Sequence, residues 1–178
     1  MRIDPKQLRT FLVDSGLVTE KDIDAAFKRA AEMRQRPGDV LVASGKISSK
    51  DLGRLEGYIL GIPFVNLEGE KIDPGVLQII PEPIARTHNI IAYKKNKKEL
   101  EVAMLDPEDL ETIEFIRKKS DLTIRPRLTN EASIKYLLSL YQKSLEAEFG
   151  EIIQNEADAV ISHSIQKEGE EEVKEDLR

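Results

Sequence analysis

The sequence predicts an α+β fold in three parts: an N-terminal helical tandem repeat of about four helices, a small α/β domain with a three- to four-stranded sheet, and an acidic helical or disordered tail. Three observations predict this order. The opening segment repeats a helical pattern, the next segment contains the first strand-like runs, and the last segment is rich in acidic residues. We therefore expect a helical tandem-repeat subdomain over residues 1–61, an α+β subdomain over 62–145 and a tail or linker over 146–178.

The composition limits the class of protein. With 40% hydrophobic and 34% charged residues, the 178 residues can bury one sizeable core or two small ones. Cysteine is absent, which excludes disulfides, thiolate metal sites and cysteine nucleophiles and suits a reducing compartment. No apolar run approaches the roughly 18 residues that a membrane span requires, and no secretory signal is visible. We expect a cytoplasmic protein without direct membrane insertion, so that any link to a membrane goes through a partner.

Charge is distributed unevenly along the chain. The sequence has 33 acidic and 27 basic residues, a formal net charge of -6. Eleven of the acids and three of the bases lie from Glu146 onward, which leaves 22 acidic and 24 basic residues in the body. A nearly neutral body with an acidic tail lacks the strong positive field of a dedicated nucleic-acid binder. We therefore expect no nucleic-acid partner.

The first part of the chain contains an internal repeat with an offset of 29 residues, the distance from Leu12 to Leu41. Glycine, cap and apolar positions stay in step between the two copies. The aligned pairs are Leu12 and Leu41, Val13 and Val42, Ser15 and Ser44, Gly16 and Gly45, Val18 and Ile47, Thr19 and Ser48, Lys21 and Lys50, Asp22 and Asp51, and Ile23 and Leu52.

Each copy predicts a short helix that ends at a glycine, Gly16 or Gly45, followed by a second helix. The second helix begins at a hydroxyl residue three positions after the glycine, with an acidic residue at its third position as in a capping box. These pairs are Thr19 with Asp22 and Ser48 with Asp51. Asp4 before Pro5 predicts the start of the first helix. Gly61 and Pro63 end the last one.

Strand and helix signals alternate in the second part. The expected elements are a strand over 62–67, a helix from Asp73-Pro74 that is interrupted at Pro81, a hairpin of strands over 90–94 and 100–105, a helix from Asp106-Pro107, a strand over 122–128, and a helix capped by Asn130. Beyond about Glu146, we expect an extended helix that fades into a disordered or linker-like end.

The sequence predicts no catalytic constellation, cofactor or metal site. The segment 44–48 resembles a P-loop only superficially, because position 40 is valine and Lys46 is followed by isoleucine. His88 and His163 are far apart in the sequence and suggest neither a metal pair nor a catalytic dyad. We expect His88 at the edge of a strand. The acidic cluster 168–172 lacks the ligand spacing of a calcium loop.

A basic hairpin is the one patch suited to phosphates or anionic lipid. It carries four lysines in the run Lys94-Lys95-Asn96-Lys97-Lys98, flanked by Glu99 and Glu101. The same run is also typical of an ordinary polar turn. An exposed hairpin edge is, in addition, suited to strand addition by a partner.

Several segments together resemble the N-terminal domain of type II secretion and type IV pilus assembly ATPases. They are the repeat, the junction Leu60-Gly-Ile-Pro-Phe-Val-Asn-Leu67, the segment from Ile80 to Arg86 and the segment from Ala103 to Pro107. The resemblance runs from about Lys6 to Tyr141. It implies a non-catalytic bacterial docking domain that binds the cytoplasmic part of an inner-membrane platform protein. It also implies that an ATPase core of the same parent protein lies further along the polypeptide.

The resemblance further implies a regulatory ligand, because paired repeats bind cyclic di-GMP in some members of that family. Aliphatic side chains would cover the guanine faces, glycine would admit the backbone, and arginine would contact phosphate. By this resemblance the candidate ligand-binding residues are Gln7, Leu8, Arg9, Leu12, Gly16, Ile23, Phe27, Arg36, Gly38, Leu41, Gly45, Leu52 and Asp106.

The family motif is only partly kept, so three interpretations stay open. Ala30 and Ile59 replace the terminal glutamines, Gln7 and Arg9 stand where arginine and glycine are expected, and Glu56 departs from the pattern. The leading interpretation is the docking domain. The second is a cyclic di-GMP sensor that uses the tandem repeat. The third is a free-standing structural interaction module, in which the same aliphatic residues form an ordinary core between helices.

Overall fold

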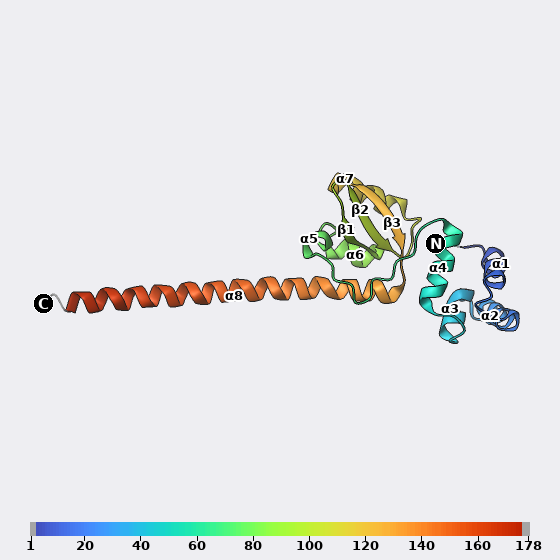
Figure 1. Cartoon of the computed structure of the whole chain (residues 1–178), viewed down its shortest axis with the longest axis horizontal. Coiled ribbons are helices and arrows are strands. Elements are labelled where there is room, and N and C mark those ends of the chain that lie inside the picture. Colours follow the sequence, from blue (N-terminus) through green and yellow to red (C-terminus); the bar gives the residue numbers. More distant parts are fainter. Residues whose placement is uncertain (1–2, 176–178) are drawn as a thin grey trace. The chain divides into compact units, whose positions relative to one another are not determined.

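The computed structural model describes residues 3–175, and the side chains of residues 3–161. The chain divides into two units, Met1–Ser139 and Leu140–Arg178, which are described separately. The first unit contains a set of helices followed by a three-stranded sheet, and a long helix leads from it into the second unit (Figure 1). The α+β fold predicted from the sequence is confirmed. The boundaries expected after residues 61 and 145 stay a prediction.

The helical repeat consists of four helices, as expected. They are α1 (Pro5–Ser15), α2 (Glu20–Met33), α3 (Pro37–Ala43) and α4 (Ser49–Leu60). Thr19 Oγ1 accepts a hydrogen bond from the Asp22 amide at 3.3 Å, and Ser48 Oγ accepts one from the Asp51 amide at 3.0 Å. Gly16 ends α1 with a φ of 65°. The second helix of each copy therefore begins by the same local chemistry. The first helices differ, because α3 has no side-chain N-cap and its C-cap is Ser44, one residue before the left-handed Gly45.

A shared apolar core joins the four helices. The buried residues are Leu8, Leu12, Val18, Ile23, Ala26, Ala30, Val40, Leu41, Ile47 and Leu52. The aligned pairs Leu12 and Leu41, Val18 and Ile47, and Ile23 and Leu52 are all among them. The periodicity of the repeat thus marks positions that the two copies bury together.

The sheet lobe, residues 62–139, is built around three strands in the order β1, β2, β3. The strands are β1 (Ile90–Lys95), β2 (Glu99–Met104) and β3 (Thr123–Leu128). β1 and β2 form the expected antiparallel hairpin, whereas β2 and β3 are parallel and are connected through α7 (Leu110–Ser120). The short helices α5 (Pro74–Leu77) and α6 (Glu82–His88) pack on β1, and α7 packs on β3.

The prediction of a strand over 62–67 is wrong. Only Phe64 pairs, through an isolated bridge to Leu128, and the other residues of the segment belong to no strand. A methyl group at Gly53 would overlap the Phe64 ring, and one at Gly57 would lie 2.6 Å from the Ile62 carbonyl oxygen. The segment therefore lies directly on the glycines of α4. This packing, which the local sequence does not reveal, replaces a regular ladder.

Two boundaries near α6 and α7 also differ from expectation. The helix expected from Asp106 begins one turn later, because Asp109 is the N-cap and accepts from the Thr112 amide at 3.1 Å. Asp106 instead accepts from the Glu108 amide at 3.1 Å in the preceding turn. His88 is the last residue of α6 and not a strand-edge residue. Left-handed Asn89 ends that helix and separates His88 from β1.

The last helix, α8 (Glu131–Glu175), begins as predicted, with Asn130 Oδ1 accepting from the Ser133 amide at 2.9 Å. Of the two structures expected for the tail, helical or disordered, the helical one is found as far as Glu175. Residues 176–178 and the side chains of His163 and of the cluster 168–172 lie outside the described residues. None of the helices in the described part of the chain combines the length and the apolar character that a membrane span requires.

Candidate functional site

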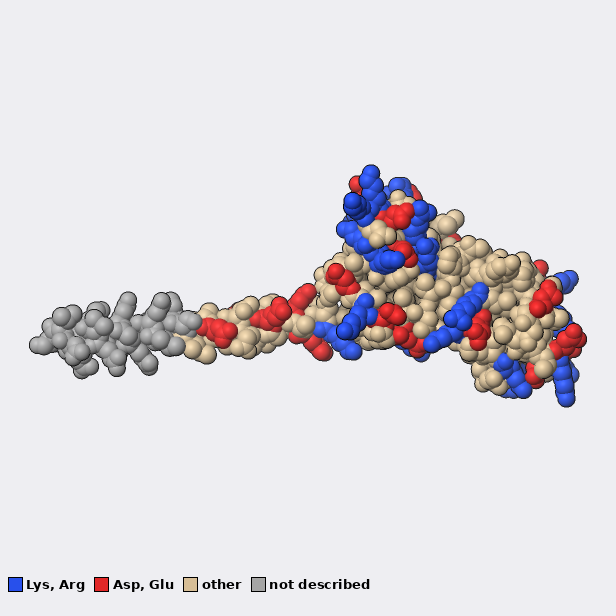
Figure 2. Space-filling model, in the orientation of Figure 1, with Lys and Arg blue, Asp and Glu red and all other residues tan. Residues whose placement is uncertain are grey.

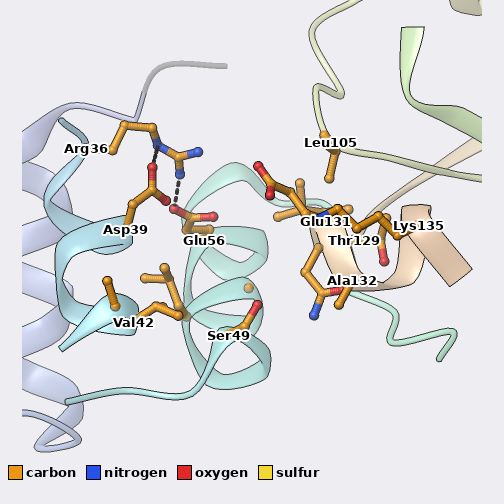
Figure 3. Close-up of a pocket in the computed structure, with 15 residues that line it drawn as sticks. Arg36, Asp39, Val42, Ser49, Glu56, Leu105, Thr129, Glu131, Ala132 and Lys135 are labelled. Atoms are coloured by element: carbon orange, nitrogen blue, oxygen red, sulfur yellow. Dashed lines mark hydrogen bonds and ion pairs between the residues drawn. The ribbon is translucent and has the colours of Figure 1, made fainter. Parts of the chain in front are cut away.

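Two cavities in the first unit share one ion pair in their walls. The repeat cavity, about 630 Å³, is lined by the first turn of α1, the start of α3 and Glu56. The junction cavity, about 620 Å³, is lined by α3 and α4 on one side and by residues 128–135 and Leu105 on the other (Figure 3). Arg36 and Glu56 line both. Any ligand of either cavity therefore meets this pair.

The ion pair joins the start of α3 to the middle of α4. Arg36 Nη2 lies 2.6 Å from Glu56 Oε1, and Arg36 Nε lies 3.9 Å from Asp39 Oδ2. The Glu56 side chain is only 9% exposed, whereas Arg36 is 54% exposed. Burial raises the pKa of Glu56 above its ordinary value, and the Arg36 guanidinium opposes this shift. Arg36 thus presents a half-exposed cation to both cavities, while the buried Glu56 carboxylate holds one edge of its guanidinium group.

Gly38 brings α3 and α4 close enough for this contact. A methyl group at this position would lie 2.9 Å from Leu52 Cδ2 and 3.6 Å from Glu56 Oε1. Gly38 is buried, and its conformation does not require glycine, since its φ is not positive. The glycine is needed here for the close approach of the two helices.

The structure brings together only part of the predicted ligand set. Leu8, Arg36 and Gly38 line the repeat cavity, and Arg36 and Leu52 line the junction cavity. The remaining candidates line neither cavity: Gln7, Arg9, Leu12, Gly16, Ile23, Phe27, Leu41, Gly45 and Asp106.

These other candidates have identifiable surroundings. Leu12, Ile23 and Leu41 are buried in the core. Arg9 Nη1 pairs with Asp24 Oδ1 at 2.5 Å, and its guanidinium lies 5.9 Å from the centre of the Phe27 ring. Gly16 and Gly45 adopt left-handed turns, Gln7 is exposed, and Asp106 lies in the turn after β2. Whether any of them binds a ligand stays a prediction.

Sequence reasoning did not predict that Glu56 lines both cavities, and treated it only as a departure from a motif. The signal was present, since Glu56 stands four residues after Leu52 on the apolar stripe of α4 and three before Ile59. A carboxylate buried on such a stripe needs a charged or hydrogen-bonding partner. Its partner is 20 residues away, so the pairing could not be read from local spacing.

His88 belongs to a polar cluster that connects α6 to α7. Its Nδ1 lies 2.8 Å from Thr112 Oγ1 and 3.2 Å from Asp109 Oδ2. Both partners meet the same ring nitrogen, so the cluster ties two helices together and does not form a hydroxyl, imidazole and carboxylate relay. Among the residues that the structure describes, no group of three or more histidine, aspartate or glutamate side chains is placed to hold a metal ion.

Comparison with known proteins decides the family. A family model for the MshEN domain matches residues 60–148, half of the chain. The chain belongs to the MshEN domain family. The resemblance to the N-terminal domains of type II secretion and type IV pilus ATPases is thereby confirmed. That domain is not the catalytic domain of those ATPases.

The curated relatives of this MshEN domain are much longer than the chain. It is 28% identical over 147 residues to the type IV pilus assembly ATPase PilB of Thermus thermophilus, which covers 82% of the chain and 16% of that protein. It is 23% identical over 135 residues to the PilB of Myxococcus xanthus, which covers 76% of the chain and 24% of that protein. The chain therefore spans less than a quarter of each relative's length.

Two solved structures share the fold of this MshEN domain. The structure described as MshE with cdg has a TM-score of 0.61 at 24% identity and covers 80% of this chain and 99% of that one. The N-terminal domain of XpsE has a TM-score of 0.51 at 15% identity and covers 78% of this chain and 96% of that one. At these identities the likeness concerns the fold alone.

Proposed function

We propose that this MshEN domain is a non-catalytic docking and regulatory domain of a bacterial type II secretion or type IV pilus assembly ATPase. It binds the cytoplasmic part of an inner-membrane platform protein and so couples that protein to the ATPase core of its own polypeptide. The observation that supports the proposal most is the MshEN match over residues 60–148. The domain works in the cytoplasm and is peripheral to the inner membrane through its partner.

The junction cavity is the surface best suited to the partner. Val42, Ala43 and Leu52 form an apolar wall, and the start of α8 adds Glu131 and Lys135 (Figure 3). A volume of about 620 Å³ accommodates one or two large anchor side chains from a partner segment. The charged rim supplies orientation, because opposite charges steer a partner more than they strengthen it.

Two variants that each replace an alanine by arginine test this docking site. Ala43→Arg places a long cation in the cavity, whereas Ala31→Arg makes the same change at an exposed position of α2 outside both cavities. Each variant is copurified with the cytoplasmic domain of the platform protein encoded in the same genome. We expect Ala43→Arg to lose the complex and Ala31→Arg to keep it. Failure of the unmodified chain to form a complex at high micromolar concentration contradicts the docking function.

A second function, cyclic di-GMP sensing, is favoured by one observation. Leu8, Arg36 and Gly38, three of the predicted ligand residues, line the same cavity of about 630 Å³. They combine an aliphatic surface, a close backbone and a cation, which are the groups that a cyclic dinucleotide requires. Glu56 competes for the cation, since it lies 2.6 Å from Arg36. A ligand phosphate must therefore share or displace this carboxylate.

Calorimetric titration with cyclic di-GMP separates the sensor from the docking domain. We expect Arg36→Ala to weaken binding at least tenfold and Glu56→Gln to tighten it, because the amide no longer neutralises the guanidinium. Arg54→Ala is the control, as Arg54 is exposed on α4 and lines neither cavity. Absence of heat at high micromolar ligand with both the unmodified chain and Glu56→Gln eliminates the sensor function.

A further inference from the structure

One end of the sheet collects basic side chains from three elements. Lys95 ends β1, Lys97 and Lys98 lie in the turn that leads to β2, and the Thr123 amide donates to the Lys98 carbonyl at 2.8 Å. β3 therefore starts beside this turn, which brings the preceding end of α7 to the same end of the sheet. Figure 2 shows lysine and arginine crowded over this projecting end. We call it the basic end: Lys94, Lys95, Lys97, Lys98, Arg117, Lys118, Lys119 and Arg125.

Acidic residues neutralise only part of this charge. Arg125 pairs with Glu99 at 2.6 Å, Arg117 with Glu114 at 2.5 Å, and Lys94 with Glu101 at 3.4 Å. Counting Asp121 as a fourth acid, eight bases face four acids, a difference of four positive charges. The chain as a whole has a net charge of -6, so the basic end is a strong local exception.

Three of the lysines stand without a carboxylate partner. Among the side chains that the structure describes, no ion pair involves Lys95, Lys97 or Lys98, and all three are exposed. A hairpin turn needs polar residues but not three neighbouring unpaired cations, which repel one another. These charges are therefore available to an anionic surface outside the chain.

The α7 part of the basic end carries an exposed aromatic ring. Phe115 on α7 is 44% exposed, and Lys119 Nζ lies 5.9 Å from the centre of its ring. Lys118 and Lys119 follow it within one turn of the helix. An apolar ring flanked by lysines is suited to the boundary between water and lipid, where the ring enters the headgroup region and the ammonium groups contact phosphates.

We propose that the basic end binds the surface of an anionic phospholipid bilayer, with Lys95, Lys97 and Lys98 contacting lipid phosphates and Phe115 entering the headgroup layer. The end is convex and presents several cations at once, which suits a flat array of headgroups. Because the field of the remaining acidic surface is screened within about 10 Å, it does not prevent contact through this end. The proposal goes beyond docking to a protein, since it gives the domain a membrane contact of its own.

Nucleic acid fits this surface less well. Single strands require exposed aromatic faces on which bases stack. Tyr93, the other aromatic residue near this end, is half-buried and donates its hydroxyl to Glu101 Oε2 at 2.6 Å. Lysine also lacks the bidentate geometry with which arginine reads base edges. The charges and the single exposed ring are those of a surface-binding patch.

Vesicle cosedimentation of the full 178-residue chain tests the proposal. One set of vesicles contains phosphatidylcholine alone, and the other contains about one-third phosphatidylglycerol. The variant Lys95→Gln/Lys97→Gln/Lys98→Gln is compared with Lys21→Gln/Lys28→Gln/Lys50→Gln, which makes the same change in net charge on the helical repeat. We expect binding to the anionic vesicles only. Since each basic residue contributes about fivefold at such a surface, the first variant should bind roughly 100-fold more weakly, whereas the control should bind like the unmodified chain.

A fluorescent reporter distinguishes the bilayer from other anions. The chain has no tryptophan, so Phe115→Trp provides a single probe. Its emission should shift to shorter wavelength with anionic vesicles and stay unchanged with inorganic phosphate or a short single-stranded DNA. The proposal is overturned by any of four results: no binding to anionic vesicles, equal losses in the two triple variants, displacement from vesicles by millimolar phosphate, or tighter binding to the DNA than to the vesicles.

Discussion

The helical repeat and the sheet lobe use charge differently. In the repeat, a buried aliphatic core holds the helices together, and the principal buried charge is Glu56, paired to Arg36 beside two cavities. In the sheet lobe, charged pairs such as Glu99 with Arg125 lie along the exposed face and end of the sheet. A localised charge at a cavity suits a selective ligand, whereas a distributed charge suits a surface. The two regions therefore carry different proposals, a ligand or docking site at the cavities and a membrane contact at the basic end.

The family match follows the same division. The MshEN match begins at residue 60, so it covers the sheet lobe and leaves out nearly all of the repeat. Of the candidate ligand residues, only Asp106 lies within it. The repeat cavity, on which the sensing proposal rests, therefore lies outside the match, whereas the junction cavity is lined on one side by residues within it, Leu105 and the start of α8.

The largest expected effect concerns the core of the repeat. Leu41 is fully buried, so Leu41→Ala should lower the free energy of unfolding by about 3 kcal/mol. Leu17 is 52% exposed, and Leu17→Ala should change it by less than about 0.5 kcal/mol. Urea unfolding measures both. Equal losses of stability in the two variants would show that the buried core of the repeat does not hold its helices together.

The next effect concerns the contact of Phe64 with α4. Gly53→Ala places a methyl group against the Phe64 ring and should cost about 2 kcal/mol. Gly150→Ala, in an open stretch of α8, should instead cause no loss, because alanine favours helix and meets no atom within 4 Å. Thermal unfolding of the two variants distinguishes this packing contact from a general intolerance of alanine.

A smaller effect concerns the buried carboxylate of the repeat. Burial raises the pKa of Glu56, so between the ordinary glutamate value and the raised value the native state binds more protons than the unfolded state. The contribution of Glu56 to the free energy of unfolding therefore falls as the pH rises through this window. Glu56→Gln removes this dependence and should change stability at neutral pH by less than about 1 kcal/mol, because burial offsets the attraction of Arg36. Urea unfolding of the unmodified chain and of Glu56→Gln at pH 5 and pH 7 tests the sign: relative to the variant, the unmodified chain should lose stability between the two pH values, and an equal pH dependence of the two proteins contradicts the prediction.

The smallest effect concerns the exposed face of the sheet. Arg125 and Glu99 are 52% and 39% exposed, so Arg125→Ala should lower the free energy of unfolding by only about 0.5 kcal/mol. A loss above about 2 kcal/mol in urea unfolding would show that this pair stabilises the fold, which conflicts with its place on a surface that is exposed for binding.

The elements that follow local rules were predictable from the sequence. The pairs Thr19 with Asp22 and Ser48 with Asp51 place two helix starts, and Asn130 places a third, because a cap depends on residues three positions away. The strand expected over 62–67 was not predictable, since its outcome depends on the glycines of α4. Asp106 and Asp109 both satisfy the cap pattern, and only the turn between them decides which one is used.

The candidate site was predictable only in part. The motif identified Leu8, Arg36 and Gly38 as candidates, and these three do line one cavity. Glu56 and the junction cavity depend on how α3, α4 and the start of α8 pack, which no periodicity encodes. Burial of the aliphatic candidates follows from their spacing, but that spacing is the same for a core and for a ligand site.

Hydrogen exchange of the chain with and without the platform protein's cytoplasmic domain tests the docking function most directly. Our account predicts slower exchange in α3, in α4 and in the first turns of α8, the elements that line the junction cavity. A complex that leaves these elements unprotected, with protection confined to α1 and α2, would contradict it.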